Sequence, residues 1–202
     1  MRILFGLLRL AAAALSIAAI LTTFLSTAAR TSINPFNFFG YFTIQSNIFT
    51  AVMLLIVGLV SVAGRRRSAK LDLAYAAATS YIVVVGIVYN ALLTGLPGRI
   101  DVPWANTVLH LIVPIYVAID WLLFGDRRRL AVKRLWTILV YPIVWLVVVL
   151  IRGATDGWVP YPFLDPANGY GSVAVYCVII AIAIAAVGWL VLWYSRIRVI
   201  KP

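Results

Sequence analysis

The class of this protein is set by one stretch of its sequence, WANTVLHLIVPIYVAIDWLLF, at residues 104–124. The stretch is as long and as apolar as a helix that crosses a membrane, which needs roughly 20 apolar residues. It also holds the single histidine of the 202-residue chain, His110. An ionisable side chain is costly inside a membrane unless it meets polar partners or water, so such residues are candidates for function. The stretch therefore predicts a membrane fold and a site within it.

The rest of the chain has the same character, with 64% hydrophobic residues and a mean hydropathy of +1.03. This composition excludes an ordinary soluble domain and predicts an all-α integral membrane protein. We expect a single domain over residues 1–202, a bundle of six transmembrane helices at about 3–29, 41–63, 71–95, 103–124, 135–151 and 170–194. The first helix is expected to be retained, because its apolar run is longer than the roughly 7–15 residues of a signal peptide.

The basic residues predict the orientation of this bundle. They gather near the termini and in two of the connecting segments: Arg2, Arg9, Arg65, Arg66, Arg67, Lys70, Arg127, Arg128, Arg129, Lys133, Arg134, Arg196, Arg198 and Lys201. Because cytoplasmic loops are enriched in Lys and Arg, we expect these segments and both termini to be cytoplasmic. The net charge of +11 is then a topology signal that anionic lipids can reinforce. Nucleic acid is not an expected partner, because the charges are split among short loops without a recognition motif.

Polar side chains on three of the predicted helices lie at a similar depth in the outer leaflet. His110 is seven residues from Pro103, roughly 10 Å below the outer surface at a rise of 1.5 Å per residue. On the same layer we place Thr43, Ser46, Asn47, Asn90, Asn106 and Thr107. Polar groups in hydrocarbon must meet one another or water, so the layer predicts an internal cavity. The alternative is a set of hydrogen bonds that only join helices. Apart from Asp120, no comparable group is expected in the cytoplasmic half.

Pro114 and Asp120 follow His110 on the same predicted helix. Proline lacks the N–H that would bond the carbonyl four residues earlier, and that carbonyl belongs to His110. We therefore expect a bend close to the histidine ring. Asp120 lies ten residues beyond His110, roughly 15 Å along the helix, which is too far for a catalytic triad. It is expected to pair with the basic residues at 127–129 or to cap a polar contact.

Metal and cofactor chemistry has little support, and no cofactor is expected. One histidine, no glutamate and six scattered aspartates do not form the ligand spacings of zinc or di-iron sites. Glycine-rich phosphate loops and a GxSxG nucleophile motif are absent from the sequence. The single cysteine, Cys177, lies in the last predicted helix, where a small buried apolar role is the ordinary one.

Three stretches resemble one known family: YFTIQSN at 41–47, NTVLHLIVPIYVAIDWLLF at 106–124 and YPFLDPANGYGSVAVY at 161–176. They are similar to the bacterial six-helix branch of the androgen-induced and androgen-dependent TFPI-regulating protein family. Animal members are integral-membrane threonine hydrolases that cleave fatty acid esters of hydroxy fatty acids. The resemblance implies a multi-pass protein of the bacterial cytoplasmic membrane with a related activity.

The family motif of a histidine, a proline four residues later and an acidic residue near the helix end matches His110, Pro114 and Asp120. Where the animal pattern has glutamate, this chain has aspartate. The shorter motif YFT implies that Thr43 is the nucleophile. A hydroxyl needs a base within hydrogen-bond reach, and His110 is the only imidazole available. Ser46 and Cys177 compete with Thr43 as nucleophile.

Further roles follow for the residues around this pair. The side-chain amides of Asn47, Asn90 and Asn106 are expected to orient the histidine or to donate to an oxyanion. Contacts to the substrate are assigned to Ser46, Thr107, Tyr161 and Phe163. The last two lie in an outer segment rich in Pro, Gly and aromatic residues, which is typical of an ordered loop or interfacial lid.

The expected substrate is a long-chain ester that reaches the cavity sideways from the bilayer, and Arg99 or Arg152 at the rim is a candidate to hold a lipid carboxylate. A lipid- or ligand-binding membrane protein without turnover remains the alternative. A small channel or transporter is disfavoured, because the sequence shows neither internal repeats nor a charged path across both leaflets. The sequence leaves the oligomeric state open.

Overall fold

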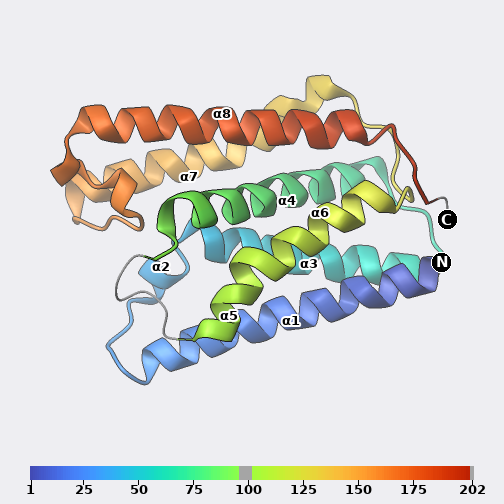
Figure 1. Cartoon of the computed structure of the whole chain (residues 1–202), viewed down its shortest axis with the longest axis horizontal. Helices are drawn as coiled ribbons and strands as arrows, with labels where there is room; N and C mark the ends of the chain where they lie inside the picture. Colours follow the sequence, from blue (N-terminus) through green and yellow to red (C-terminus); the bar gives the residue numbers. More distant parts are fainter. Residues whose placement is uncertain (96–101, 201–202) are drawn as a thin grey trace.

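The structure is a computed structural model that describes residues 1–95 and 102–200 (Figure 1). In this part of the chain the regular structure is helical, and one isolated bridge joins Phe124 to Ile200. Among these residues six helical spans are long and apolar enough to cross a membrane: Arg2–Ala28, Phe42–Val62, Ala69–Leu93, Pro103–Leu123, Val132–Thr155 and Tyr170–Tyr194. The prediction of an all-α, multi-pass membrane protein is therefore confirmed. The predicted loop charges Arg99, Asp101 and Lys201 lie outside the described residues.

Four of the spans contain one long α-helix each, namely α1 (Arg2–Ala28), α3 (Phe42–Val62), α7 (Leu135–Thr155) and α8 (Tyr170–Tyr194). The third span is α4 (Ala69–Val88) continued by a π-helical turn at Tyr89–Leu93. The fourth consists of α5 (Pro103–Thr107), a π-helical turn at Val108–Ile112 and α6 (Val113–Leu123). The irregularity expected near Pro114 is thus a π turn that holds His110.

Short elements close the connections at the end of the bundle away from the termini, where the chain turns between spans. The helix α2 (Pro35–Phe38) begins after Asn34, whose side chain caps it by accepting the N–H of Phe36. The segment before α8 forms two 3₁₀ turns, Pro162–Leu164 and Pro166–Asn168. This is the ordered, non-strand loop that its Pro and Gly content predicts.

The helices alternate in direction, so the N and C termini lie at the same end of the bundle (Figure 1). Helix α1 runs along α3, and α4 contacts α3, α6 and α8. Small residues allow these close approaches, as is common between membrane helices. A Cβ atom added at Gly6 would lie 3.0 Å from the carbonyl oxygen of Gly58, and one at Gly86 would lie 2.9 Å from Pro114 Cβ.

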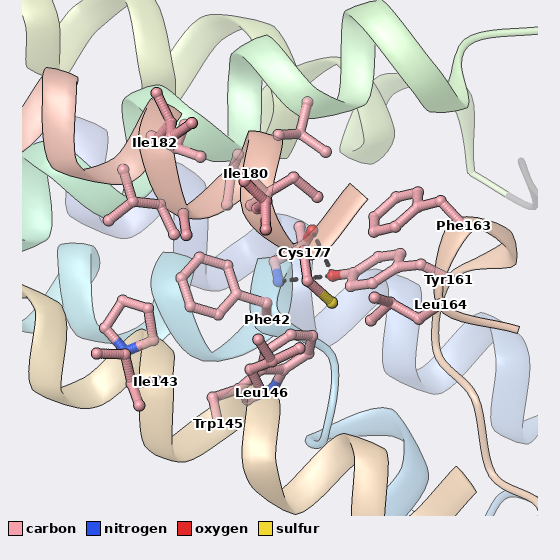
Figure 2. A pocket seen from close by; sticks show the side chains of 18 of the residues that line it. Phe42, Ile143, Trp145, Leu146, Tyr161, Phe163, Leu164, Cys177, Ile180 and Ile182 are labelled. Carbon is pink, nitrogen blue, oxygen red and sulfur yellow. Dashed lines mark hydrogen bonds between the residues drawn. The ribbon is translucent and has the colours of Figure 1, made fainter. Parts of the chain in front are cut away.

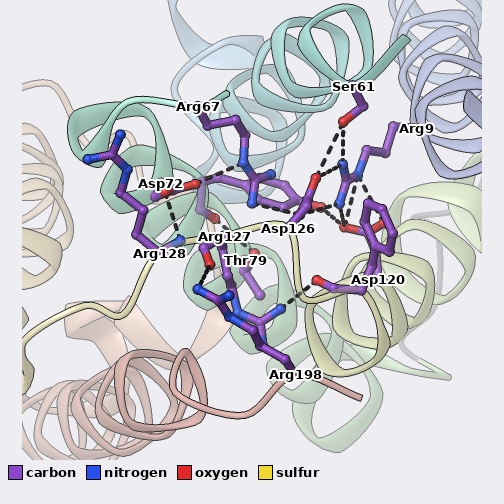
Figure 3. A network of polar contacts seen from close by, with 12 residues as sticks. Arg9, Ser61, Arg67, Asp72, Thr79, Asp120, Asp126, Arg127, Arg128 and Arg198 are labelled. Atoms are coloured by element: carbon purple, nitrogen blue, oxygen red, sulfur yellow. Dashed lines mark hydrogen bonds and ion pairs between the residues drawn. The ribbon is translucent and has the colours of Figure 1, made fainter. Parts of the chain in front are cut away.

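A buried ionic network holds the end of the bundle where both termini lie (Figure 3). Arg9 on α1 is 1% exposed and pairs with Asp120 at 3.0 Å and with Asp126 at 2.7 Å. It also donates to Ser61 on α3, while the hydroxyl of Tyr75 on α4 donates to Asp120 at 2.7 Å. The prediction that Asp120 pairs with the basic residues at 127–129 is therefore wrong. The side chain of Asp120 on α6 meets Arg9 on α1 and not the loop that follows α6.

The network continues through the loops at the same end. Arg67 pairs with Asp72 and with Asp126, at 2.8 Å in each case. Arg127 donates to the carbonyl oxygens of Phe124 and Ile197. Its burial, together with the charge of Arg67, lowers the pKa of Arg127 to about 10, so it stays protonated at neutral pH. The expectation that this half of the bundle lacks a polar cluster is wrong. The sequence does not reveal the cluster, because each element contributes only one or two of its groups.

Candidate functional site

A cavity of about 480 Å³ lies at the opposite end of the bundle and brings the two proposed catalytic residues together. Thr43 and His110 both line it, as do Tyr89, Asn106 and Tyr161. These residues come from α3, α4, the fourth span and the loop before α8. Part of the predicted polar layer therefore lines one cavity, and the place of this cavity in the outer leaflet stays a prediction.

The ring of His110 is held in one orientation by its neighbours. Its Nδ1 lies 3.0 Å from the backbone carbonyl oxygen of Asn106, which can only accept a hydrogen bond. In the neutral ring Nδ1 therefore carries the proton, and Nε2 is left as the basic nitrogen. The ring stacks on Tyr89 with centroids 3.7 Å apart, and Asn106 Nδ2 donates to the Tyr89 hydroxyl at 2.6 Å. Asn106 thus orients the histidine through its main chain and supports the stacked tyrosine through its side chain.

Thr43 is the second residue of α3, and its side chain is 8% exposed. Its hydroxyl lies 3.2 Å from the hydroxyl of Tyr161, and its backbone N–H donates to the same tyrosine oxygen at 3.1 Å. Because the first N–H groups of a helix lack partners within the helix, this contact satisfies one of them. Within the described residues, no hydrogen bond joins Thr43 to His110. The two side chains face the same cavity from different walls.

The asparagines of the predicted layer are engaged with backbone carbonyls. Asn47 Nδ2 donates to the carbonyl oxygens of Thr43 at 3.0 Å and Leu109 at 3.3 Å. Asn90 Nδ2 donates to those of Gly86 at 2.8 Å and His110 at 3.3 Å. The carbonyl that Pro114 leaves without its helical partner is thus satisfied from the π turn that follows α4. Asn47 and Asn90 are not among the residues that line the cavity.

Some of the remaining predicted site residues line a second cavity, and the others lie outside both cavities. Phe163 and Cys177 line a second, apolar cavity described below. Ser46 is fully buried and lines neither cavity, and Thr107 is exposed with its hydroxyl donating to Pro103 O. The π turn accounts for the exposure of Thr107. A wider turn breaks the α-helical spacing that would place Thr107 beside His110.

The second cavity has a volume of about 430 Å³ and opens between α4, α7 and α8 (Figure 2). Its walls are almost entirely apolar and include Ile143 and Leu146 from α7 and Ala181 from α8. Sequence reasoning did not find it, because an apolar wall in a membrane helix resembles one that faces lipid. Thr43 and Tyr161 line this cavity as well as the polar one. Tyr89 and Leu93 line both cavities too, so the two cavities share a wall that includes the threonine.

A further hollow of about 730 Å³ lies at the same end of the bundle, next to Arg152 and Trp158. The guanidinium of Arg152 pairs with Asp156 at 2.7 Å, donates to Asn37 at 2.8 Å and lies over the Trp158 ring. The N–H of Trp158 and the charge of Arg152 lower the pKa of Asp156 below its usual range. Arg152 thus already has a carboxylate partner at the rim.

No group of three or more His, Cys, Asp or Glu side chains that could hold a metal ion occurs in the described residues. Comparison of the chain with family models, with curated proteins and with solved structures finds no match.

Proposed function

We propose that this protein is an intramembrane hydrolase of long-chain lipid esters, with Thr43 as nucleophile and His110 as base. The resemblance to membrane threonine hydrolases suggests fatty acid esters of hydroxy fatty acids as the type of substrate. It also suggests a bacterial cytoplasmic membrane, with both termini cytoplasmic and the site in the outer leaflet. No cofactor takes part in the proposed reaction.

The observation that carries this proposal is the position of Thr43 between the two cavities. The apolar cavity suits the acyl chain of a lipid, while the polar cavity suits the ester and the alcohol part. A carbonyl group placed between them would lie next to the threonine hydroxyl. Because the apolar cavity opens between helices, the chain would enter from the bilayer. If short, water-soluble esters were hydrolysed faster than long-chain ones, this arrangement of the substrate would be wrong.

The reaction then proceeds in two stages. Thr43 Oγ1 attacks the ester carbonyl as its proton passes to Nε2 of His110, and the C=O electron pair moves onto oxygen. When this pair returns, the bond to the alcohol oxygen breaks and the alcohol takes the proton from His110. Water repeats the sequence on the acyl-threonine, releasing the fatty acid and returning the proton to Thr43. Catalytic hydrogen bonds often tighten only after the substrate binds, and one water molecule can bridge base and nucleophile.

A lipid-binding protein without turnover is the second candidate, and one observation favours it. The hydroxyl of Thr43 lies within hydrogen-bond distance of Tyr161, and His110 has its own partner at Asn106. In such a protein both residues would only line a binding site. Activity measurements on variants separate the two functions.

The test compares the wild-type protein with Thr43→Ala, His110→Ala and the double variant in lipid or detergent. Because base and nucleophile act as a unit, each single change should abolish most turnover, and the double variant should be little worse. Ser46→Ala is the matched control, since it removes a buried hydroxyl three residues from Thr43 that lines neither cavity. A fluorophosphonate probe followed by mass spectrometry should label Thr43. Label on Ser46 or Cys177, or full activity in His110→Ala, would contradict the proposed mechanism.

A further inference from the structure

The proposed reaction needs a hydrogen-bond donor for the oxyanion that forms on the ester carbonyl. The asparagine amides that the sequence suggests for this role are held elsewhere. Asn47 and Asn90 donate to backbone carbonyls, and Asn106 donates to Tyr89. Turning any of them toward Thr43 would break these hydrogen bonds, each of which contributes roughly 0.5–1.5 kcal/mol.

Tyr161 is the residue whose hydroxyl lies beside the reacting atom. Its oxygen is 3.2 Å from Thr43 Oγ1 and 3.1 Å from the Thr43 backbone nitrogen (Figure 2). In the tetrahedral intermediate the oxyanion and Oγ1 are bonded to the same carbon. A donor in contact with Oγ1 is therefore within reach of the oxyanion after a small adjustment. The Thr43 N–H points to the same place, and the positive end of the α3 dipole favours negative charge there.

Tyr161 is also held rigidly enough for this role, with a side chain that is 7% exposed. Its ring stacks on Phe163 with centroids 5.2 Å apart and an interplanar angle of 8°. It meets Tyr41 edge-on at 5.6 Å, and Trp145 lies 6.0 Å away. The backbone N–H of Leu164 donates to the Tyr161 carbonyl within the 3₁₀ turn. A donor fixed in advance in a water-poor site stabilises developing charge without reorganisation.

We propose that Tyr161 is the oxyanion donor of this site, acting together with the backbone N–H of Thr43. This inference rests on the proposed hydrolase function. Without substrate, the tyrosine oxygen accepts the Thr43 N–H and holds the threonine in place. As the Oγ1–carbon bond forms, the ester carbonyl oxygen receives the electron pair. It then accepts hydrogen bonds from the Tyr161 hydroxyl and from the Thr43 N–H. The tyrosine keeps its proton throughout, and the proton of Thr43 goes to His110.

The experiment is Tyr161→Phe, which keeps the stacked ring and removes only the hydroxyl. Loss of one oxyanion donor lowers kcat by about 10²–10³ fold in other enzymes, and we expect a loss of that order with little change in KM. A long-chain trifluoromethyl ketone, which forms a tetrahedral adduct with Thr43, should bind more weakly by a similar factor. The matching ether analogue, which forms no adduct, should bind unchanged. Tyr176→Phe is the control. It removes a phenolic hydroxyl on α8, from a ring whose centroid lies 5.7 Å from that of Phe163.

The outcomes separate this inference from the hydrolase proposal. Full turnover in Tyr161→Phe, with Thr43→Ala inactive, would overturn the role of Tyr161 and leave the hydrolase intact. An equal loss of affinity for the ketone and the ether would also overturn it, because a purely structural role weakens both. If the wild-type protein hydrolyses no long-chain ester and the ketone forms no adduct on Thr43, the hydrolase proposal itself fails. Wherever the ether analogue still binds, the site is folded.

Discussion

Replacing Arg9 by methionine should destabilise the protein more than any other single change at the end where the termini meet. The guanidinium makes hydrogen bonds to both oxygens of Asp120 and to Asp126. Without it, Asp126 keeps Arg67, but Asp120 keeps only the Tyr75 hydroxyl among the contacts described above. A buried carboxylate that loses its ionic partner typically costs about 3–5 kcal/mol. At about 2–4 °C per kcal/mol for a chain of this size, the melting temperature should fall by about 6–20 °C.

The measurement is thermal unfolding of the purified protein in one detergent, with Arg9→Lys and Arg9→Met/Asp120→Leu as companions. Lysine keeps the charge but lacks the planar fork, so it should lie between the wild type and Arg9→Met. The double variant removes both charges. Its loss of stability should therefore be smaller than the sum of the losses measured for Arg9→Met and Asp120→Leu. A melting temperature for Arg9→Met within about 2 °C of the wild type would refute the reasoning, because the ion pair would then contribute nothing measurable.

The other predictions concern the site and the packing that supports it. Leucine at Ala181 should shorten the acyl cavity, so kcat/KM for long esters should fall about fourfold per excluded methylene, while shorter esters are spared; equal losses at every length would contradict this. Hydrolysis should decline as pH is lowered through the titration of His110, because only its neutral ring accepts a proton; a pH profile that is flat in acid would exclude it as base. Gly86→Ala should cost about 1–3 kcal/mol of stability because its Cβ would press on Pro114, whereas Gly171→Ala, with open space around it, should be neutral or stabilising by up to about 1 kcal/mol.

The spans were predictable because lipid imposes a length and a composition on each helix. The sequence predicts a helix at residues 103–124, and the observed span is Pro103–Leu123. The ends of other helices were less certain. The predicted span 135–151 extends to Thr155, since Arg152 near its end is neutralised by Asp156 and by contact with Trp158. The orientation of the bundle remains a prediction from the loop charges.

The ionic network was not predictable, because it arises from contacts between elements far apart in the sequence. Arg9 and Asp120 are 111 positions apart in the sequence. Read singly, a lone arginine in the first helix indicates topology and a lone aspartate indicates a helix end. Only packing of α1 against α6 and of α4 beside them shows that the charges neutralise one another.

The histidine site shows why a span that reads as ordinary can hold an unusual structure. Two π turns, one ending the third span and one following the short first helix of the fourth, bring Tyr89 and His110 face to face. π turns are rare and are frequent at functional sites, where a wider turn changes which side chains face inward. Here the wider turn leaves Thr107 outside and keeps Asn106 beneath the ring, while Asn90 satisfies the His110 carbonyl. If residues 106–110 formed a regular α-helix, Asn106 and Thr107 would both be expected on the same face as His110. Tyr89 and Asn90, in the π turn that follows α4, explain how a titratable ring is held in this stretch of apolar sequence.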